Sequence, residues 1–217
     1  MNITRLQFTL VLMLTGVLSS FSAPAQAIAV WNESVNGDLS DNGLIPTDLG
    51  QLQRGNNSLT ATFSLGQTIP DTDYFTFEVP SQLSLEQIIL KSFTPEDEGA
   101  FFAVQTGNVF DFVFTGPNAT GLLGWIDVGQ ERLNTDILDD MGRANLSPSA
   151  PGATGFTPPL PTGQYSFWLR QGGERPVTVT LDFVTSVPEP STIVGLEAIL
   201  GLGSAAFLKR NIFRKKV

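Results

Sequence analysis

Four aspartates lie in two stretches of the chain that are rich in turn-forming residues, WNESVNGDLSDN (31–42) and DTDYFTFEVP (71–80). They are Asp38, Asp41, Asp71 and Asp73. Carboxylates in loops are the hard oxygen ligands that Ca²⁺ requires, so these residues form a candidate calcium site. The spacing matches no EF-hand loop, and Asp in a turn also forms local hydrogen bonds with the backbone. Calcium binding and turn stabilisation both stay open at this point.

The three tryptophans of the chain, Trp31, Trp125 and Trp168, offer a second kind of chemistry. A flat aromatic ring that faces solvent can stack on a sugar. In the stretch QYSFWLRQ (164–171), Trp168 falls on the face opposite Tyr165 and Phe167. Because Trp is highly buried on average, core packing is the alternative for each of the three. Glycan binding is therefore a candidate function that the sequence leaves open.

Catalysis is disfavoured by composition. The 217 residues contain neither His nor Cys, so the usual side chains of zinc sites, thiol chemistry and catalytic triads are missing. Two groups of neighbouring carboxylates remain, Glu96 to Glu98 and the pair Asp139 and Asp140. Glycosidase acids must face each other across a cleft, which neighbours in a polar turn do not do. We expect a protein that is not an enzyme.

A period of two residues dominates the segment between Ile28 and Val187, which has the length of one domain. We expect strands over 58–65, 73–80, 83–93, 99–107, 110–114, 122–128, 164–171 and 176–184, and a short helix within 134–142. The turn GGER (172–175) predicts a hairpin between the last two strands. The pattern predicts an all-β antiparallel sandwich or jelly roll, flanked by an N-terminal signal helix and a C-terminal hydrophobic helix.

This domain is strongly acidic, with 19 Asp and Glu residues against 6 Lys and Arg residues in 28–187. Such a surface repels nucleic acid and favours solubility or divalent cations. We expect no nucleic-acid partner.

The N-terminal residues 1–27 have the order of a secretory signal peptide. Arg5 precedes an apolar run over 8–18, and small residues then lead to Ala25 and Ala27. We expect signal peptidase to cut after Ala27, the alternative being a buried N-terminal helix. The mature chain would then begin at Ile28.

The C-terminal residues predict a short membrane anchor. The segment 193–208 has 16 residues that are apolar apart from Glu197 and Ser204, and as a helix it would span only ~24 Å of a hydrocarbon core of ~30 Å. A cluster of five Lys and Arg residues follows within 209–216 and predicts a cytoplasmic C-terminus.

This tail, 188–217, together with the stretch Val187, Pro188, Glu189, Pro190 and Ser191, resembles the PEP-CTERM sorting signal. The resemblance implies an inner-membrane-anchored precursor. An exosortase would cut it near the motif, leaving the product at the cell surface or outside the cell, often in bacteria that make extracellular polysaccharide. A simple tail anchor with a Pro-rich linker is the alternative.

The stretches WNESVNGDLSDN and DTDYFTFEVP, with the closing GQYSFW (163–168), are similar to the bacterial pre-peptidase C-terminal (PPC-like) domain and its cyanobacterial PEP-CTERM relatives. That resemblance implies a jelly-roll β-sandwich that serves as an accessory or binding module, and some members hold calcium. We therefore expect an exported, non-catalytic protein of the envelope or extracellular matrix, with a secreted glycan-binding module as the alternative.

Overall fold

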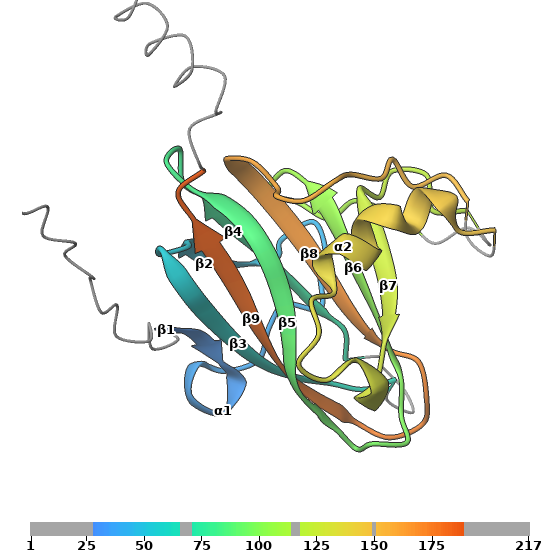
Figure 1. Cartoon of the computed structure of the whole chain (residues 1–217). Helices are drawn as coiled ribbons and strands as arrows, with labels where there is room; N and C mark the ends of the chain where they lie inside the picture. The colour runs from blue at the N-terminus through green and yellow to red at the C-terminus, as the bar shows by residue number, and fades with distance from the viewer. Residues whose placement is uncertain (1–27, 66–70, 114–117, 149–150, 189–217) are drawn as a thin grey trace, which may run out of the picture.

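The computed structural model describes residues 28–65, 71–113, 118–148 and 151–188, which form two β-sheets packed face to face (Figure 1). One sheet contains, in spatial order, β1 (Ile28–Asn32), β3 (Gly55–Phe63), β9 (Val177–Ser186) and β5 (Ser84–Thr94). The other contains β2 (Thr47–Gln51), β4 (Asp73–Val79), β8 (Gly163–Gln171), β6 (Ala100–Thr106) and β7 (Gly124–Val128). The expected all-β sandwich is confirmed.

The pairing of strands differs from the expected fully antiparallel arrangement at one edge of each sheet. β1 pairs with β3 in parallel, and β2 pairs with β4 in parallel, whereas the other paired strands are antiparallel. The physical reason is the connection, because β1, β2, β3 and β4 alternate between the two sheets. A chain that crosses to the other sheet and returns can place its next strand in the same direction as the first.

The same alternation makes the predicted hairpin wrong. The turn at 172–175 joins β8 to β9, but these strands belong to different sheets and do not pair with each other. Only β6 and β7 are both consecutive and paired among the described strands. The local turn residues correctly predict a reversal of the chain, but the pairing depends on which sheet each strand completes.

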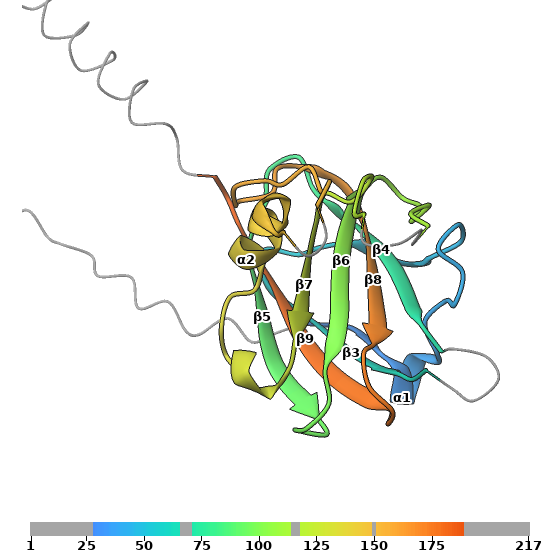
Figure 2. The ribbon, with the colours of Figure 1, turned by 90° about the vertical axis from the view of Figure 1, so that its right-hand side faces the viewer.

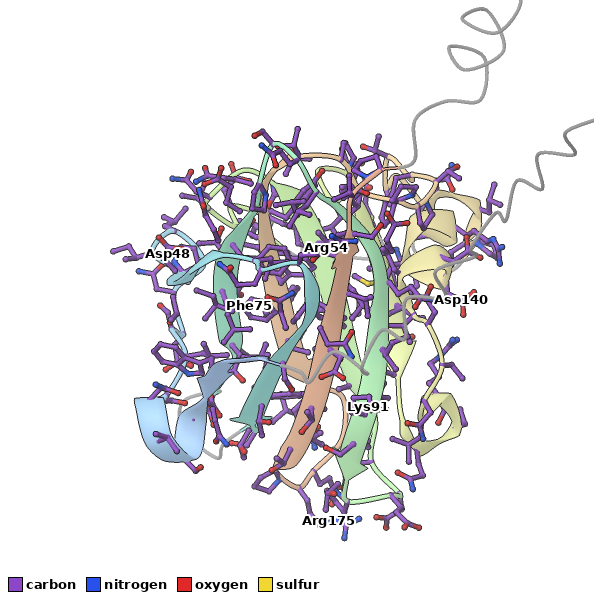
Figure 3. All side chains as sticks on the ribbon, turned by 60° about the vertical axis from the view of Figure 1, so that its left-hand side comes forward. Asp48, Arg54, Phe75, Lys91, Asp140 and Arg175 are labelled. Carbon is purple, nitrogen blue, oxygen red and sulfur yellow. The ribbon has the colours of Figure 1, made fainter. Side chains whose placement is uncertain are left out.

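The space between the sheets is filled by aromatic rings on the inward positions of the strands, as the period of two predicts. Phe75, Phe77, Phe167 and Phe183 are each at most 1 % exposed. The Phe167 ring centroid lies 5.1 Å from that of Phe75 and 4.8 Å from that of Phe77. Figure 3 shows Phe75 between the two sheets. Phe183 on β9 belongs to the other sheet, and its ring centroid lies 5.0 Å from that of Phe77 in an edge-to-face geometry, so the rings hold the two layers together.

The outer face of the β2–β4–β8–β6–β7 sheet carries a second apolar cluster. Its members are Ala103, Phe110, Ala119, Leu122, Ala144, Ala153 and Trp168. The expected strand at 110–114 is wrong, because residues 108–113 form an irregular segment in which Phe110 is buried against this face. The apolar alternation that predicted a strand instead reflects a loop that packs on the outside of a sheet.

Four short helical segments complete the described fold. They are α1 (Glu33–Asn36), η1 (Gln130–Arg132), α2 (Leu138–Gly142) and η2 (Arg143–Leu146). The expected helix within 134–142 is confirmed as α2, although it begins four residues later, where Asp136 Oδ1 accepts the Leu138 N–H. α1 and α2 lie on opposite sides of the sandwich (Figures 1 and 2).

The expected signal peptide, the rest of the sorting motif after Pro188 and the hydrophobic segment 193–208 lie outside the described residues. Within the described ranges, no helix has the length and apolar character needed to cross a bilayer.

We expect Leu59→Ala, at a position with 0 % exposure, to lower the free energy of unfolding by about 2–5 kcal/mol, because it leaves a cavity in the core. The same truncation at Leu146, which is 75 % exposed, should cost less than about 0.5 kcal/mol. Denaturant unfolding of both variants measures the difference. Equal losses would contradict the core described here.

Candidate functional site

The segment that follows β1 is held in a fixed loop by local hydrogen bonds. Asn32 caps α1, its side chain accepting the Ser34 N–H at 3.0 Å. Gly37 then leaves the helix with a φ of +90°, a conformation that suits glycine. The Trp31 indole donates to the Gly37 carbonyl at 3.0 Å. These contacts place Asp38 beside the first turn of α1, where Glu33 lies.

Glu33 is tied to backbone groups on two sides. Its Oε1 accepts the Leu39 N–H at 3.0 Å, and its Oε2 accepts the N–H of Thr62 on β3. A bridge then joins the loop to the second sheet, because the Ser40 carbonyl accepts the N–H of Tyr74 on β4 at 2.8 Å. The residue before Tyr74 is therefore brought to the same loop. That residue is Asp73.

The result is a cluster of three carboxylates from three segments. Glu33, Asp38 and Asp73 each place one oxygen within 4.8 Å of the others. Asp73 is 0 % exposed, and neither of its carboxylate oxygens has a hydrogen-bond partner among the described residues. A buried carboxylate without partners is costly unless a proton or a cation neutralises it.

The pKa values of the cluster reflect that cost. Burial, followed by repulsion from Glu33 and Asp71, raises the pKa of Asp73 to about 9. Burial also raises the pKa of Glu33 to about 7, although its backbone hydrogen bonds oppose the shift. The pKa of Asp71 rises to about 6 for the same first reason, with Asp38 and Asp41 adding repulsion. The site therefore attracts positive charge.

The donor set fits Ca²⁺. Calcium bonds oxygen at about 2.3–2.6 Å, so two of its ligands can be about 5 Å apart, and the 4.8 Å limit of the cluster meets this condition. The three carboxylates would supply part of the six to eight oxygens that calcium takes, with water or carbonyl groups as the rest.

Two of the four aspartates expected from sequence, Asp38 and Asp73, lie in this cluster. Asp41 and Asp71 border it, since both raise the pKa of Asp73, but neither is within the three-carboxylate group. The Asp41 carboxylate instead accepts the Thr72 N–H at 2.9 Å, a bond between the two acidic loops and not the local turn bond that was the alternative. Glu33 was missed. Its signal was its position five residues before Asp38, across a glycine turn.

The three tryptophans do not share one surface. Trp31 belongs to β1 and packs against the main core, whereas Trp125 and Trp168 lie on the outer face of the other sheet. Trp168 is 6 % exposed and Trp125 is half-buried. Any shared sugar-stacking surface therefore involves Trp125 and Trp168 without Trp31.

The acidic turns considered for catalysis are occupied by ion pairs. Arg175 pairs with Asp97 and, at 2.9 Å, with Glu98. Asp140 pairs with Arg132 at 2.6 Å, and Asp139 pairs with Arg143. The pairs of Arg175 and Arg132 link segments that are apart in sequence, whereas the pair of Asp139 and Arg143 lies within one helical segment.

No family model matches the chain, and no curated protein or solved structure matches it significantly.

The raised pKa values predict how stability depends on pH without metal. The folded state holds protons on Asp71, Glu33 and Asp73 up to about pH 6, 7 and 9, whereas the unfolded state releases them near pH 4. The stabilisation of the folded state by these three protons is fully present below about pH 4. It is lost as the pH rises through about 6, 7 and 9.

In a chelating buffer we therefore expect the melting temperature to fall as the pH is raised from about 5 to about 9. Saturating Ca²⁺ should remove most of this slope, since the cation replaces the protons. Thermal denaturation followed by circular dichroism measures both curves. A melting temperature that rises over this range in chelator would show that the cluster is not a proton-binding site.

Proposed function

We propose that the chain is an exported, non-catalytic protein of the bacterial envelope or extracellular matrix, whose β-sandwich is completed by a calcium ion. The observation that carries the calcium site is Asp73, a fully buried carboxylate with two unpartnered oxygens that lies against Glu33 and Asp38. The oxygen-only donors favour a hard cation such as calcium. Zinc prefers His and Cys ligands, and the chain has neither.

The ion would act as a link between the two sheets. Glu33 follows β1 and bonds to β3 of one sheet, whereas Asp73 begins β4 of the other. A cation between them would join the layers at the end of the sandwich where α1 lies. A chain without Cys has no disulfide that could serve this purpose. Extracellular modules bind calcium with dissociation constants of about 10⁻⁴–10⁻³ M, which suits an exported protein.

The position of the last strand supports processing at the tail. β9 ends at Ser186, just before the proposed sorting motif. A cut near the motif would therefore leave β9 intact. Val187 is 49 % exposed and Pro188 is exposed as well, so the start of the motif is accessible.

The likeness to the PEP-CTERM tail and to the PPC-like jelly roll supports the same proposal. The residue types of the motif suit this role, because two prolines disfavour a helix and would leave the glutamate between them accessible to a membrane-embedded exosortase. In this account the chain is the substrate of the exosortase. The precursor is held in the inner membrane by its tail and is then released or transferred to the cell exterior.

We expect about 10 mM CaCl₂ to raise the melting temperature of the protein at pH 7.5 by about 3–10 °C. This concentration is about 10 to 100 times the dissociation constants given above, so the ion stabilises the folded state by about 1.4–2.7 kcal/mol, and each kcal/mol is worth about 2–4 °C at this size. Asp73→Asn should abolish the rise because it removes a buried anionic ligand. Differential scanning calorimetry measures the shift.

Asp48→Asn is the matched control for that substitution. Asp48 is exposed, lies outside the cluster and accepts the Gly50 N–H at 2.8 Å, a bond that Asn retains. This variant should keep the full calcium shift. The calcium site would be refuted if wild-type protein showed no shift, or if Asp73→Asn kept it.

The tail is tested in a host that contains an exosortase. Mass spectrometry of the exported protein should read a chain that begins at Ile28 and lacks the hydrophobic segment. A variant with Pro188→Ala and Glu189→Ala should accumulate in the inner membrane at full C-terminal length, because the recognition strip is lost while the apolar span is kept. Glu174→Ala, in an exposed turn, should be processed normally. Normal trimming of the double variant would identify the tail as an ordinary anchor.

A further inference from the structure

The outer face of the β4–β8–β6–β7 region presents two adjacent cross-strand rows of side chains. In the first row, Phe101 on β6 lies opposite Asp127 on β7 and opposite Arg170 on β8. In the second row, Ala103 on β6 lies between Trp125 and Trp168. Side chains that differ by two positions along a strand share a face, so both rows belong to one surface. Figure 2 shows β7, β6 and β8 side by side on this face.

The rings of these rows form a continuous aromatic surface. The Phe101 centroid lies 5.6 Å from that of Trp125, in a stacked geometry, and 5.4 Å from that of Trp168, edge to face. Tyr74 on β4 extends the row, because its ring stacks on Trp168 at 5.7 Å with an interplanar angle of 6°. Phe101, Trp125 and Tyr74 are only partly buried. An apolar surface of aromatic rings therefore reaches solvent.

A cavity of about 390 Å³ opens on this surface. Its walls include Phe101, Trp125, Asp127, Trp168, Arg170 and Gln171. The volume is within the range of about 300–1,000 Å³ that is usual for small-molecule sites. The cavity thus combines aromatic walls with an acid, a base and an amide.

The polar groups around the cavity are free to bind a ligand. The Arg170 guanidinium lies 5.8 Å from the Trp168 ring centroid, and Asp127 is exposed. Neither side chain forms an ion pair or a hydrogen bond with another residue of the described ranges. The indole N–H groups of Trp125 and Trp168 and Oε1 of Gln171 also have no partner there, although these atoms are buried. Unpartnered buried polar atoms are uncommon in folded proteins.

We propose that this cavity binds a neutral hexopyranose unit of a polysaccharide. The CH face of the sugar ring would lie against Phe101 and Trp125, and its hydroxyl groups would donate to Asp127 and accept from Arg170. A carboxylate and a guanidinium together match the paired donors and acceptors of vicinal hydroxyls. The net negative charge of the domain disfavours an anionic glycan or a nucleic acid. The site is separate from the carboxylate cluster, so the proposal does not depend on calcium.

The test uses NMR of the full ¹⁵N-labelled chain with calcium present, in a detergent that has no sugar head group. The chain has three tryptophans and thus three indole N–H signals, which Trp→Phe variants assign. The probes are neutral hexasaccharides of glucose, galactose and mannose at up to about 10 mM, a range that detects even millimolar binding. At least one probe should shift the signals of Trp125 and Trp168 in a saturable way and leave that of Trp31 unchanged.

Two substitutions locate the site. Trp125→Ala and Arg170→Gln should each weaken binding at least about tenfold, because one removes a stacking ring and the other a hydrogen-bonding cation. Arg54→Gln, the same change at an exposed arginine outside the cavity, should have no effect (Figure 3). Arg170 is partly exposed, so Arg170→Gln tests the site even if Trp125→Ala disturbs the fold.

Three results would overturn the proposal. The first is the absence of a shift with all three hexasaccharides. The second is a shift of the Trp31 signal equal to those of the other two indoles, which would indicate a general effect. The third is a pair of observations: Arg170→Gln binds the hexasaccharide with unchanged affinity, and a purely apolar aromatic probe binds the cavity with the same affinity. Together they would make the cavity a hydrophobic site without sugar selectivity.

Discussion

The buried carboxylate of Asp73 is the constraint on which the arrangement of this sandwich depends. A charge at this position has no hydrogen-bond partner among the described residues and has other carboxylates beside it, so the folded state needs a proton or a cation there. A purely structural role would be served as well by an apolar residue, as at the neighbouring inward positions Phe75 and Phe77. Retaining an acid at this point sacrifices intrinsic stability. In return, the stability of the sandwich depends on the concentration of protons or cations in solution. This dependence favours an ion-binding role for Asp73.

The rest of the fold explains why such a link is useful. The aromatic core holds the centres of the two sheets together, with Phe167 in contact with Phe75, Phe77 and Phe183. The N-terminal strand β1 is an edge strand that pairs only with β3 among the described strands. An edge strand is paired on one side only, so fewer hydrogen bonds hold it in the sheet. A cation shared by the loop after β1 and the start of β4 would secure this edge to the opposite sheet.

Sequence periodicity predicted the interior of the sandwich well and its topology poorly. Alternation identifies inward residues such as Leu59, Val179 and Phe183, because burial on one face of a strand is a local property. It does not indicate which sheet a strand joins, and the wrong hairpin at 172–175 follows from that.

For the site, two acidic loops predicted Asp38 and Asp73, because oxygen ligands in turns are recognisable. Glu33 lies in the same acidic loop as Asp38, but its approach to Asp73 depends on the pairing of Ser40 with Tyr74. That contact is tertiary, so the sequence does not predict which acid of the loop meets Asp73.

The two proposed sites are connected through consecutive residues of one strand. Because side chains alternate along β4, Asp73 points to the carboxylate cluster while Tyr74 points to the outer face, where its ring stacks on Trp168. The Tyr74 N–H is also the group that bonds to the loop carrying Asp38. A cation that fixes the start of β4 therefore also fixes the ring at one end of the aromatic row. The cavity itself lies farther along that row, at Phe101 and Trp125, which are held by β6 and β7. Calcium would thus support the edge of the aromatic surface, at Tyr74, whereas β6 and β7 would support its centre. Metal removal should therefore disturb the ring of Tyr74 more than the rings of Phe101 and Trp125.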